Sequence, residues 1–257
     1  EEKFNAIFQL SENVRAMSAQ LTAAMKEQEN GSREVLAAIK TISAVTAEVK
    51  DGSGQMLKGG KGAVAGNGGG AIYAEGTLIM TDCTVTDNEA EYGNGGGICA
   101  ESTLTMESCT VNGNTAADDD SVGGGAIYAA GRLAMRGCTI SGNYAKKDGG
   151  GIYAVGDLSL TDCTITANES QNNGYGSSSG SGSGGGIYIK GRCTMTSGSV
   201  TGNKANSNGK GGGIYIDGTA SLTMTGGTLT GNEATVNKTG GGVYVNGASF
   251  TMNGTSC

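Results

Sequence analysis

The hydrophobic and polar positions of most of this chain follow a repeat. Seven times after Gly69, a glycine run is followed by a β-branched residue, two short segments of alternating apolar residues and Asn. The spacing of these units, 25 to 35 residues, is typical of a solenoid. Alternation with period two, separated by Gly, Asn and Ser, predicts strands. We therefore expect a mainly β protein, a parallel β-helix of about seven coils over 68–257. The β-branched residues are Ile72, Ile98, Ile127, Ile152, Ile187, Ile214 and Val243.

The alternation also predicts which side chains face inward. In the third strand of the first coil, Cys83 and Val85 share one face, and Thr84 and Thr86 share the other. Because the apolar set must be buried, the hydroxyls face outward. Cys99 occupies a position that is Tyr in other coils, so we expect it to be exposed.

Four cysteines occupy one equivalent position in successive coils. Stacked positions about 4.8 Å apart are too distant for a disulfide, and a line of sulfurs is not a zinc tetrahedron. We interpret them as small buried hydrophobic residues, and Cys193 as the replacement of an inward Leu. The four are Cys83, Cys109, Cys138 and Cys163.

A turn Asn closes the third strand of six coils. Asn tolerates left-handed backbone and can hydrogen-bond its neighbours in adjacent coils, so we predict a structural ladder. Its members are Asn88, Asn114, Asn143, Asn168, Asn203 and Asn232.

A tyrosine column follows the inward β-branched residues and points outward, broken only at Cys99. Such a column can stack sugar rings or dock a partner, or it can be a structural stack partly covered by loops. The variable insertions, 116–122 and 171–183, fall at one corner, where we expect ligand contact. The candidate binding surface is Tyr73, Tyr128, Tyr153, Tyr188, Tyr215 and Tyr244.

Composition limits the function further. The chain has 49 Gly, no Pro and no His, and its net charge is -7. An acidic repeat region argues against a nucleic-acid partner, and the lack of His excludes His-dependent catalytic triads. Asp82 and Asp162 lie three coils apart, about 14 Å, which is beyond the separation of paired catalytic carboxylates. Asp118–Asp120 is an acidic loop run, for which weak calcium binding is a minor alternative. We expect no enzyme, no cofactor and no bound metal.

Residues 1–58 have a different pattern. Counting sevens from Ile7 gives an apolar seam with small residues in its middle, which predicts one long amphipathic helix. Such a helix needs a partner along its stripe, so we expect self-association as a coiled coil or bundle. Residues 59–67 are expected to be a glycine-rich linker. No segment is apolar enough to span a membrane.

The segment Ala23-Ala24-Met25-Lys26-Glu27-Gln28-Glu29-Asn30 resembles a methylation site in the cytoplasmic domain of methyl-accepting chemotaxis proteins. The resemblance covers residues 1–58 and implies modification at Gln28, with Glu27 beside it. It also implies a cytoplasmic signal transducer, although the kinase-contacting tip, the sensor and the membrane spans of that family are missing from this chain.

The repeats resemble those of polymorphic outer-membrane proteins, which are autotransported bacterial adhesins. The motifs that carry this resemblance are Gly69-Gly70-Ala71-Ile72, Gly124-Gly125-Ala126-Ile127, and an aliphatic residue three before Asn where that family has Phe. The resemblance implies a right-handed β-helix on the cell surface or secreted, with a host-cell or glycan ligand. This localisation conflicts with that implied by residues 1–58.

A third alternative is ice binding. Outward Thr-x-Thr pairs occur in three coils, at Thr84, Thr164 and Thr228 and the residues two positions after them. Asn112 and Ser141 interrupt this array, and outward Thr is ordinary strand chemistry.

Overall fold

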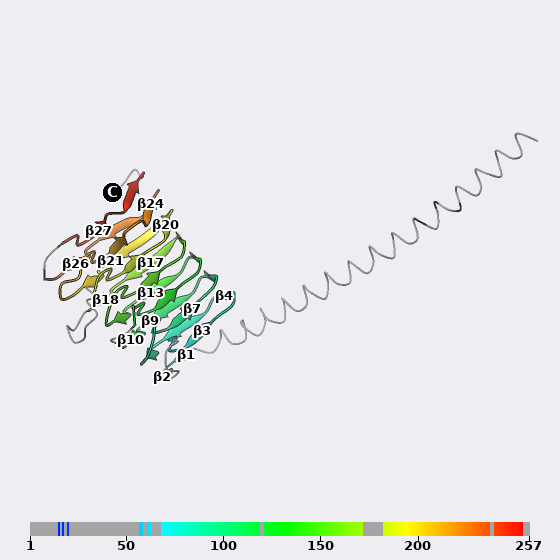
Figure 1. The fold of residues 1–257 in the computed structure, drawn as a ribbon, viewed down its shortest axis with the longest axis horizontal. Helices are drawn as coiled ribbons and strands as arrows, with labels where there is room; N and C mark the ends of the chain where they lie inside the picture. Colours follow the sequence, from blue (N-terminus) through cyan, green and yellow to red (C-terminus); the bar gives the residue numbers. More distant parts are fainter. Residues whose placement is uncertain are drawn as a thin grey trace, which may run out of the picture. The chain divides into compact units, whose positions relative to one another are not determined.

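The chain is described from a computed structural model (Figure 1). The structure describes residues 68–118, 121–171, 182–236 and 239–253, the backbone of two short strands within 57–62, and Arg15, Met17 and Gln20. The chain divides into two units, Glu1–Asp51 and Gly52–Cys257. The three described residues of the first unit have helical backbone. The rest of the expected N-terminal helix, including Glu27 and Gln28, lies outside the described residues. In the described part, no helix has the length and apolar character to cross a membrane.

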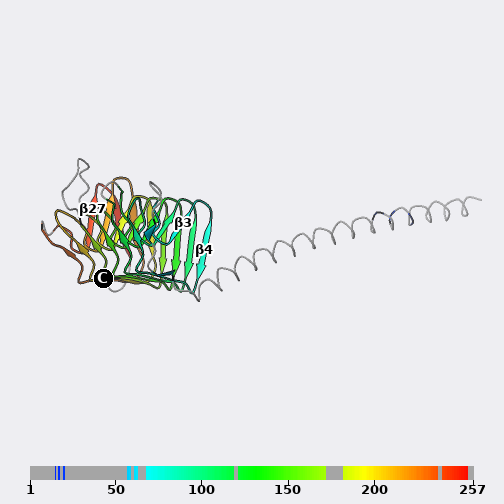
Figure 2. The same cartoon turned by 90° about the horizontal axis from the view of Figure 1, so that it is seen from below.

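The second unit is built from four parallel sheets, whose strands stack rung upon rung along one axis (Figures 1 and 2). Sheet C contains β3 (Ile72–Ala74), β7 (Ile98–Ala100), β11 (Ile127–Ala129), β15 (Ile152–Ala154), β19 (Ile187–Ile189), β23 (Ile214–Asp217) and β27 (Val243–Asn246). Sheet D contains β4 (Leu78–Thr81), β8 (Leu104–Glu107), β12 (Leu133–Arg136), β16 (Leu158–Thr161), β20 (Arg192–Met195), β24 (Ser221–Met224) and β28 (Ser249–Met252).

The other two sheets contain the third strand of each rung and a very short fourth strand. Sheet A contains β1 (Leu57–Lys58), β5 (Thr84–Thr86), β9 (Thr110–Asn112), β13 (Thr139–Ser141), β17 (Cys163–Thr166), β21 (Gly198–Thr201) and β25 (Thr228–Thr230). Sheet B contains β2 (Lys61–Gly62), β6 (Glu89–Ala90), β10 (Thr115–Ala116), β14 (Tyr144–Ala145), β18 (Glu169–Ser170), β22 (Lys204–Ala205) and β26 (Glu233–Ala234). The sheets therefore begin within the segments that the sequence assigns to the end of the helix and to the linker.

The prediction of a parallel β-solenoid is confirmed, but the number of coils is corrected. Among the described residues, β3 through β26 make six complete turns of four strands, and β27 and β28 begin another. Each complete turn lies between two successive glycine motifs. Seven motifs therefore enclose six turns, and counting the motifs gives one coil too many. The fourth strand was not predicted, because two residues are too few to show an alternation.

The interior is filled by the predicted inward side chains. Val85, Ile98, Leu104 and Leu133 are each 0% exposed, and the register pairs like with like, as in Leu104 with Leu133. Identical or similar side chains thus stack directly above one another, which buries apolar surface in each added rung.

Left-handed backbone recurs in each rung at a glycine of the glycine run, as at Gly124 with φ 80°, and at two further corners. One precedes the Cys position, as at Asp82 with φ 54°, and the other precedes the Asn, as at Asp87 with φ 56°. Asn tolerates left-handed backbone, but it does not adopt this conformation here, because the preceding residue makes the corner. Glycine serves this role at Gly113 and Gly142, with φ of 64° and 61°.

Candidate functional site

The Asn residues form a buried ladder between sheets A and B. Asn143 is 1% exposed, and its Nδ2 donates to Asn168 Oδ1 at 2.8 Å and to the Val111 carbonyl at 3.0 Å. Its Oδ1 accepts hydrogen bonds from the Asn114 backbone N–H at 2.9 Å and from Asn114 Nδ2 at 3.0 Å. The pattern recurs from Asn88 to Asn232. With every polar atom engaged inside the fold, the ladder has a structural role rather than a binding role.

The tyrosine column lies outside the interior, on sheet C, but it is not an open surface. Tyr153, Tyr188 and Tyr215 are only 2 to 8% exposed, so these rings fit the alternative of a covered structural stack and not that of an open binding column. Neighbouring rings stack with centroids 4.8 Å apart, and Tyr128 and Tyr244 continue the stack at 5.7 and 5.4 Å. The column is a second apolar cluster.

Burial changes the ionisation of the stacked phenols. It raises the pKa of Tyr215 to about 12, and nearby Asp217 contributes in the same direction. Burial likewise raises the pKa of Tyr153 and Tyr188. Tyr73, at the N-terminal end of the column, is 38% exposed, since the neighbouring rung carries no ring. Access to the column from solvent is therefore greatest at this end.

Cys99 stands at the gap in the column and is 0% exposed, which corrects the expectation that it is accessible. Its thiol donates to Glu101 Oε1 at 3.5 Å, and burial raises its pKa to about 12. A short side chain beside bulky neighbours is covered by them. Cys193 is also 0% exposed, between Leu158 and Leu222 in register, as expected for an inward Leu position.

The corner between sheets B and C carries the insertions and packs over the tyrosines. Asp148 Oδ1 accepts the Ser183 N–H at 2.7 Å, and the buried Ser170 hydroxyl donates to the Gly182 carbonyl at 2.5 Å. Lys210 Nζ lies 4.6 Å from the Tyr244 ring centroid. Burial raises the pKa of Asp148 to about 6. The base of the second insertion is thus tied to β18 and to Asp148 of the preceding rung, and Lys210 contacts the end of the tyrosine stack. Asp119, Asp120 and 172–181 lie outside the described residues.

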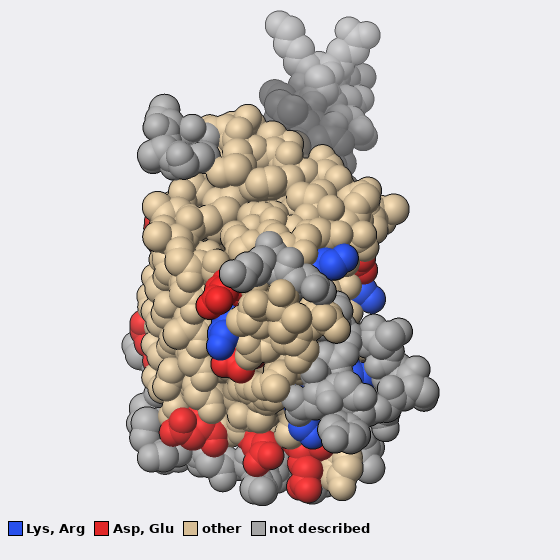
Figure 3. Space-filling view, turned by 90° about the vertical axis from the view of Figure 1, so that its left-hand side faces the viewer, with Lys and Arg blue, Asp and Glu red and all other residues tan. Residues whose placement is uncertain are grey.

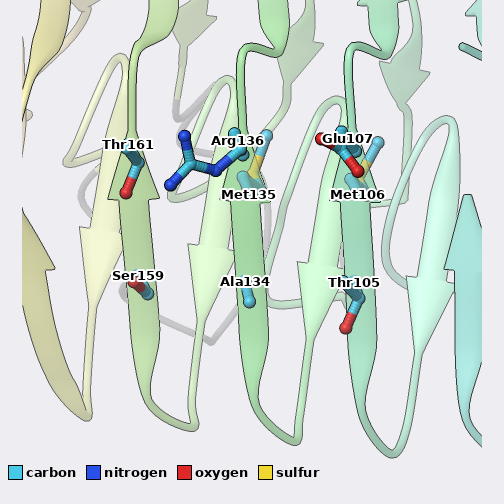
Figure 4. Close-up of a pocket in the computed structure, with 8 residues that line it drawn as sticks. All are labelled: Thr105, Met106, Glu107, Ala134, Met135, Arg136, Ser159 and Thr161. Atoms are coloured by element: carbon cyan, nitrogen blue, oxygen red, sulfur yellow. The ribbon is translucent and has the colours of Figure 1, made fainter. Parts of the chain in front are cut away.

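The outer face of sheet D carries a shallow hollow of about 300 Å³ (Figure 4). The hollow exists because Ala134 and Ser159 are small and adjacent in register. Figure 4 shows the Arg136 side chain extended from β12 toward Thr161 on β16, with Glu107 on the other side of β12. Its lining is Thr105, Met106, Glu107, Ala134, Met135, Arg136, Ser159 and Thr161.

Arginine is confined to this face within the β-helix. Arg132, Arg136 and Arg192 are the three arginines after residue 58, and all three project outward from, or immediately before, strands of sheet D. Arg192 Nη2 donates to Asp157 Oδ2 at 3.0 Å, whereas Arg136 Nη1 lies 4.0 Å from Asp162 Oδ2. Arg136 and Asp162 are each more than 60% exposed, so their pairing is weak and Arg136 can turn to another acceptor. In Figure 3, acidic side chains gather along the lower edge of the face shown.

This face was not predicted from the sequence. The candidate carboxylate Asp162 lies at its edge, but the hollow itself requires Ala134, Ser159 and Arg136 to be neighbours across rungs. Aligning the coils by their Leu-x-Met segments would have placed these residues side by side.

The thiols of the four stacked cysteines form a column under the corner before sheet A. Cys109, Cys138 and Cys163 are each 1% exposed, and Cys83 is 7% exposed. Each thiol donates to the carbonyl two residues earlier, at 3.2 to 3.3 Å, so all four side chains have the same orientation. The Cys109 N–H donates to Cys138 Sγ at 3.4 Å. Hydrogen bonds with the thiols of Cys109 and Cys163, together with burial, raise the pKa of Cys138.

The outward hydroxyls of sheet A form columns. Thr84, Thr110, Thr139 and Thr164 occupy successive register positions, while Asn112 interrupts the neighbouring column. Exposure is uneven, from buried Thr86 to exposed Thr228. Among the residues that the structure describes, no group of three or more His, Cys, Asp or Glu side chains is arranged to hold a metal ion.

These observations define the class of protein: a parallel β-solenoid repeat protein with an internal Asn ladder and an outward tyrosine stack. Residues 64–256 match the family model described as "Right handed beta helix region", so the chain belongs to that family. The search of curated proteins found no match. The search of solved structures also found none.

Proposed function

We propose that this chain is a non-catalytic binding module of a bacterial cell-surface or secreted protein, of the autotransporter adhesin type, with a glycan or host-cell ligand. The outer face of sheet D is the proposed recognition surface. The observation that carries the proposal is the hollow beside Arg136, on the face to which arginine is confined.

This surface has chemistry suited to a polar ligand. Guanidinium groups offer five N–H donors in a planar fork, and Ser159, Thr105 and Thr161 supply hydroxyls around the hollow. Glu107 supplies an acceptor on the other side. The strands fix the backbone positions of these groups, so binding orders only their side chains and even a shallow site can be selective.

The tyrosine stack is a weaker candidate for direct contact than the sequence indicates. Its central rings are covered, so their part in the proposal is to hold the corner loops in place. Ligand contact by the loops themselves remains part of the proposal. The proposal of binding without catalysis is supported by the complete lack of His and by the rung separation of Asp82 and Asp162.

The test is binding of the purified full chain to a glycan array and to cultured host cells. Arg136→Ala and Ala134→Arg, which remove the guanidinium or fill the hollow, are expected to reduce binding at least tenfold. Arg192→Ala is the matched control, since Arg192 lies on the same face but does not line the hollow. Equal loss in all three variants, or binding unaffected by any of them, would contradict this assignment.

The chemotaxis alternative rests on residues 1–58, most of which lie outside the described residues, and it stays a prediction. Its readout is distinct, because methyl transfer to Gln28 after deamidation would be detected by mass spectrometry.

A further inference from the structure

The outer face of sheet A differs from the other three sheet faces, because its described strands from β9 to β25 project no charged and no aromatic side chain outward. Sheet D carries Arg136 there, sheet C the tyrosines and sheet B Glu169. Strand propensity explains the Thr residues of sheet A but not the exclusion of charge, since outward positions of the other sheets accept it. The ten outward positions are Thr110, Asn112, Thr139, Ser141, Thr164, Thr166, Ser199, Thr201, Thr228 and Thr230.

The register of sheet A arranges these side chains in a two-dimensional array. Thr139 pairs with Thr164 and Ser141 with Thr166, and the pairing is one to one from β9 to β25. Rungs repeat about every 4.8 Å, and alternate residues of a strand repeat about every 6.6 Å. Short polar groups therefore recur at fixed intervals in two directions, over about 19 Å along the axis for the four rung steps.

Hydrogen bonds between rungs hold part of this array in place. Ser141 Oγ donates to Asn112 Oδ1 at 2.9 Å, so the amide that interrupts the run of hydroxyls is bonded into the same column. Thr201 Oγ1 donates to Thr166 Oγ1 at 3.3 Å. Thr is also stiff at χ1 because its Cβ is branched, so binding costs little side-chain entropy. A hydroxyl has one donor and two acceptor sites, so the bonded groups keep capacity for water.

We propose that the outer face of sheet A binds the surface of ice. A face without charge has nothing to pair with a nucleic acid or an anionic membrane, and without aromatic side chains it offers no platform for sugar rings. Ice is a neutral lattice that also presents oxygens at fixed repeats in two directions, and the two spacings of the array are close to the unit-cell repeats of hexagonal ice. Since a bridging water is enthalpically nearly as good as a direct hydrogen bond, rows of hydroxyls can hold rows of lattice waters. This surface is separate from the hollow on sheet D.

The test is thermal hysteresis of the purified full chain, measured on a single ice crystal in a nanolitre osmometer. We expect a gap between the melting and freezing temperatures and faceted crystal growth within it. Thr164→Lys and Ser199→Lys each place a long charged side chain in the array, and each should reduce the gap at least fivefold. The two positions are neighbours in one column, so either variant gives the result if the other does not fold.

Thr223→Lys is the matched control, because Thr223 is an outward residue of sheet D that lies between Thr194 and Thr251 in register. It should keep the thermal hysteresis of the unsubstituted chain, and circular dichroism verifies that each variant is folded. No hysteresis in the unsubstituted chain, or an equal loss in Thr223→Lys and Thr164→Lys, would overturn the proposal. A dimer in solution that Thr164→Lys separates into monomers would overturn it as well, because a second copy of the chain would then cover this face.

Discussion

Replacing Asn143 by Ala tests whether the Asn ladder stabilises the solenoid. Its side chain makes five hydrogen bonds, two accepted from Asn114 and three donated, to Asn168, Val111 and Ser141. The Ala variant leaves the buried Asn114 N–H without this acceptor, and an unsatisfied buried donor lowers the free energy of unfolding by about 1 to 3 kcal/mol. The other bonds contribute about 1 kcal/mol each at most, with two N–H groups shared among three acceptors. We expect a total loss of about 3 to 5 kcal/mol in the free energy of unfolding.

The assay is urea unfolding followed by far-ultraviolet circular dichroism. A lower urea midpoint with an unchanged m value, the slope of the unfolding free energy against urea concentration, reports lost stability. A smaller m value reports that the rungs on the two sides of Asn143 unfold separately. Asn112→Ala is the matched control, because Asn112 is exposed and its side chain accepts one hydrogen bond, from Ser141. It should cost less than about 0.5 kcal/mol. If Asn143→Ala costs below about 1 kcal/mol, or no more than the control, the ladder is not a major source of stability.

Three further predictions follow from single sites. Gly123→Ala should lower the free energy of unfolding by more than about 2 kcal/mol, because φ is 128° and the added Cβ would lie 1.8 Å from the Asp148 carbonyl oxygen. Gly218→Ala is the control, since its φ is 53° and its Cβ would meet open space, and it should cost only about 1 kcal/mol. Thermal melting compares the two variants. The raised pKa of Asp148, about 6, means that the native state holds its proton more tightly than the unfolded chain. This group therefore stabilises the fold below about pH 4, and that contribution of about 3 kcal/mol is lost as the pH rises through 6. Asp148→Asn should abolish that part of the pH dependence of urea unfolding; an unchanged profile would contradict it. Finally, absorbance titration should show Tyr215 ionising near pH 12 in the folded protein, because burial raises its pKa. A Tyr215→Phe variant should lack that step. Ionisation of all tyrosines near pH 10, the ordinary value, would contradict the burial of the stack.

The sequence predicted the features that depend on one rung alone. Inward positions such as Val85 and Leu133 follow from period-two alternation, and each is fully buried. The stacking of like residues follows from the repeat, as in Ile127 beside Ile152. The fourth strand, such as Glu89–Ala90, was missed because two residues show no periodicity, although their hydrogen bonds are made with the rungs on either side.

The accessibility of the tyrosines could not be predicted in the same way. Alternation states which side of a sheet a residue faces, but not what else packs on that side. Tyr153 faces away from the interior and is still 2% exposed, because the corner with Asp148 and Ser183 lies against the same cluster. Cys99, between Tyr73 and Tyr128 in register, is covered as well although its side chain is short. Contacts of this kind depend on loops whose conformation the repeat does not determine.

The position of the Asn ladder shows how a local conformation decides burial. A turn Asn in an exposed corner would have no reason to recur in six rungs, since Gly, Ser or Asp would serve equally well. Here the left-handed residue is the one before it, Asp87 or Ala167 as well as Gly, so the corner is complete when the chain reaches the Asn. The Asn side chain then points into the fold and bonds the rung behind it and the rung ahead. Only an amide has both an N–H donor pair and a strong acceptor at this length. Asp at position 143 could still accept from Asn114, but it would place oxygen lone pairs against Asn168 Oδ1 and the Val111 carbonyl, so the ladder would break on the side where Asn143 donates.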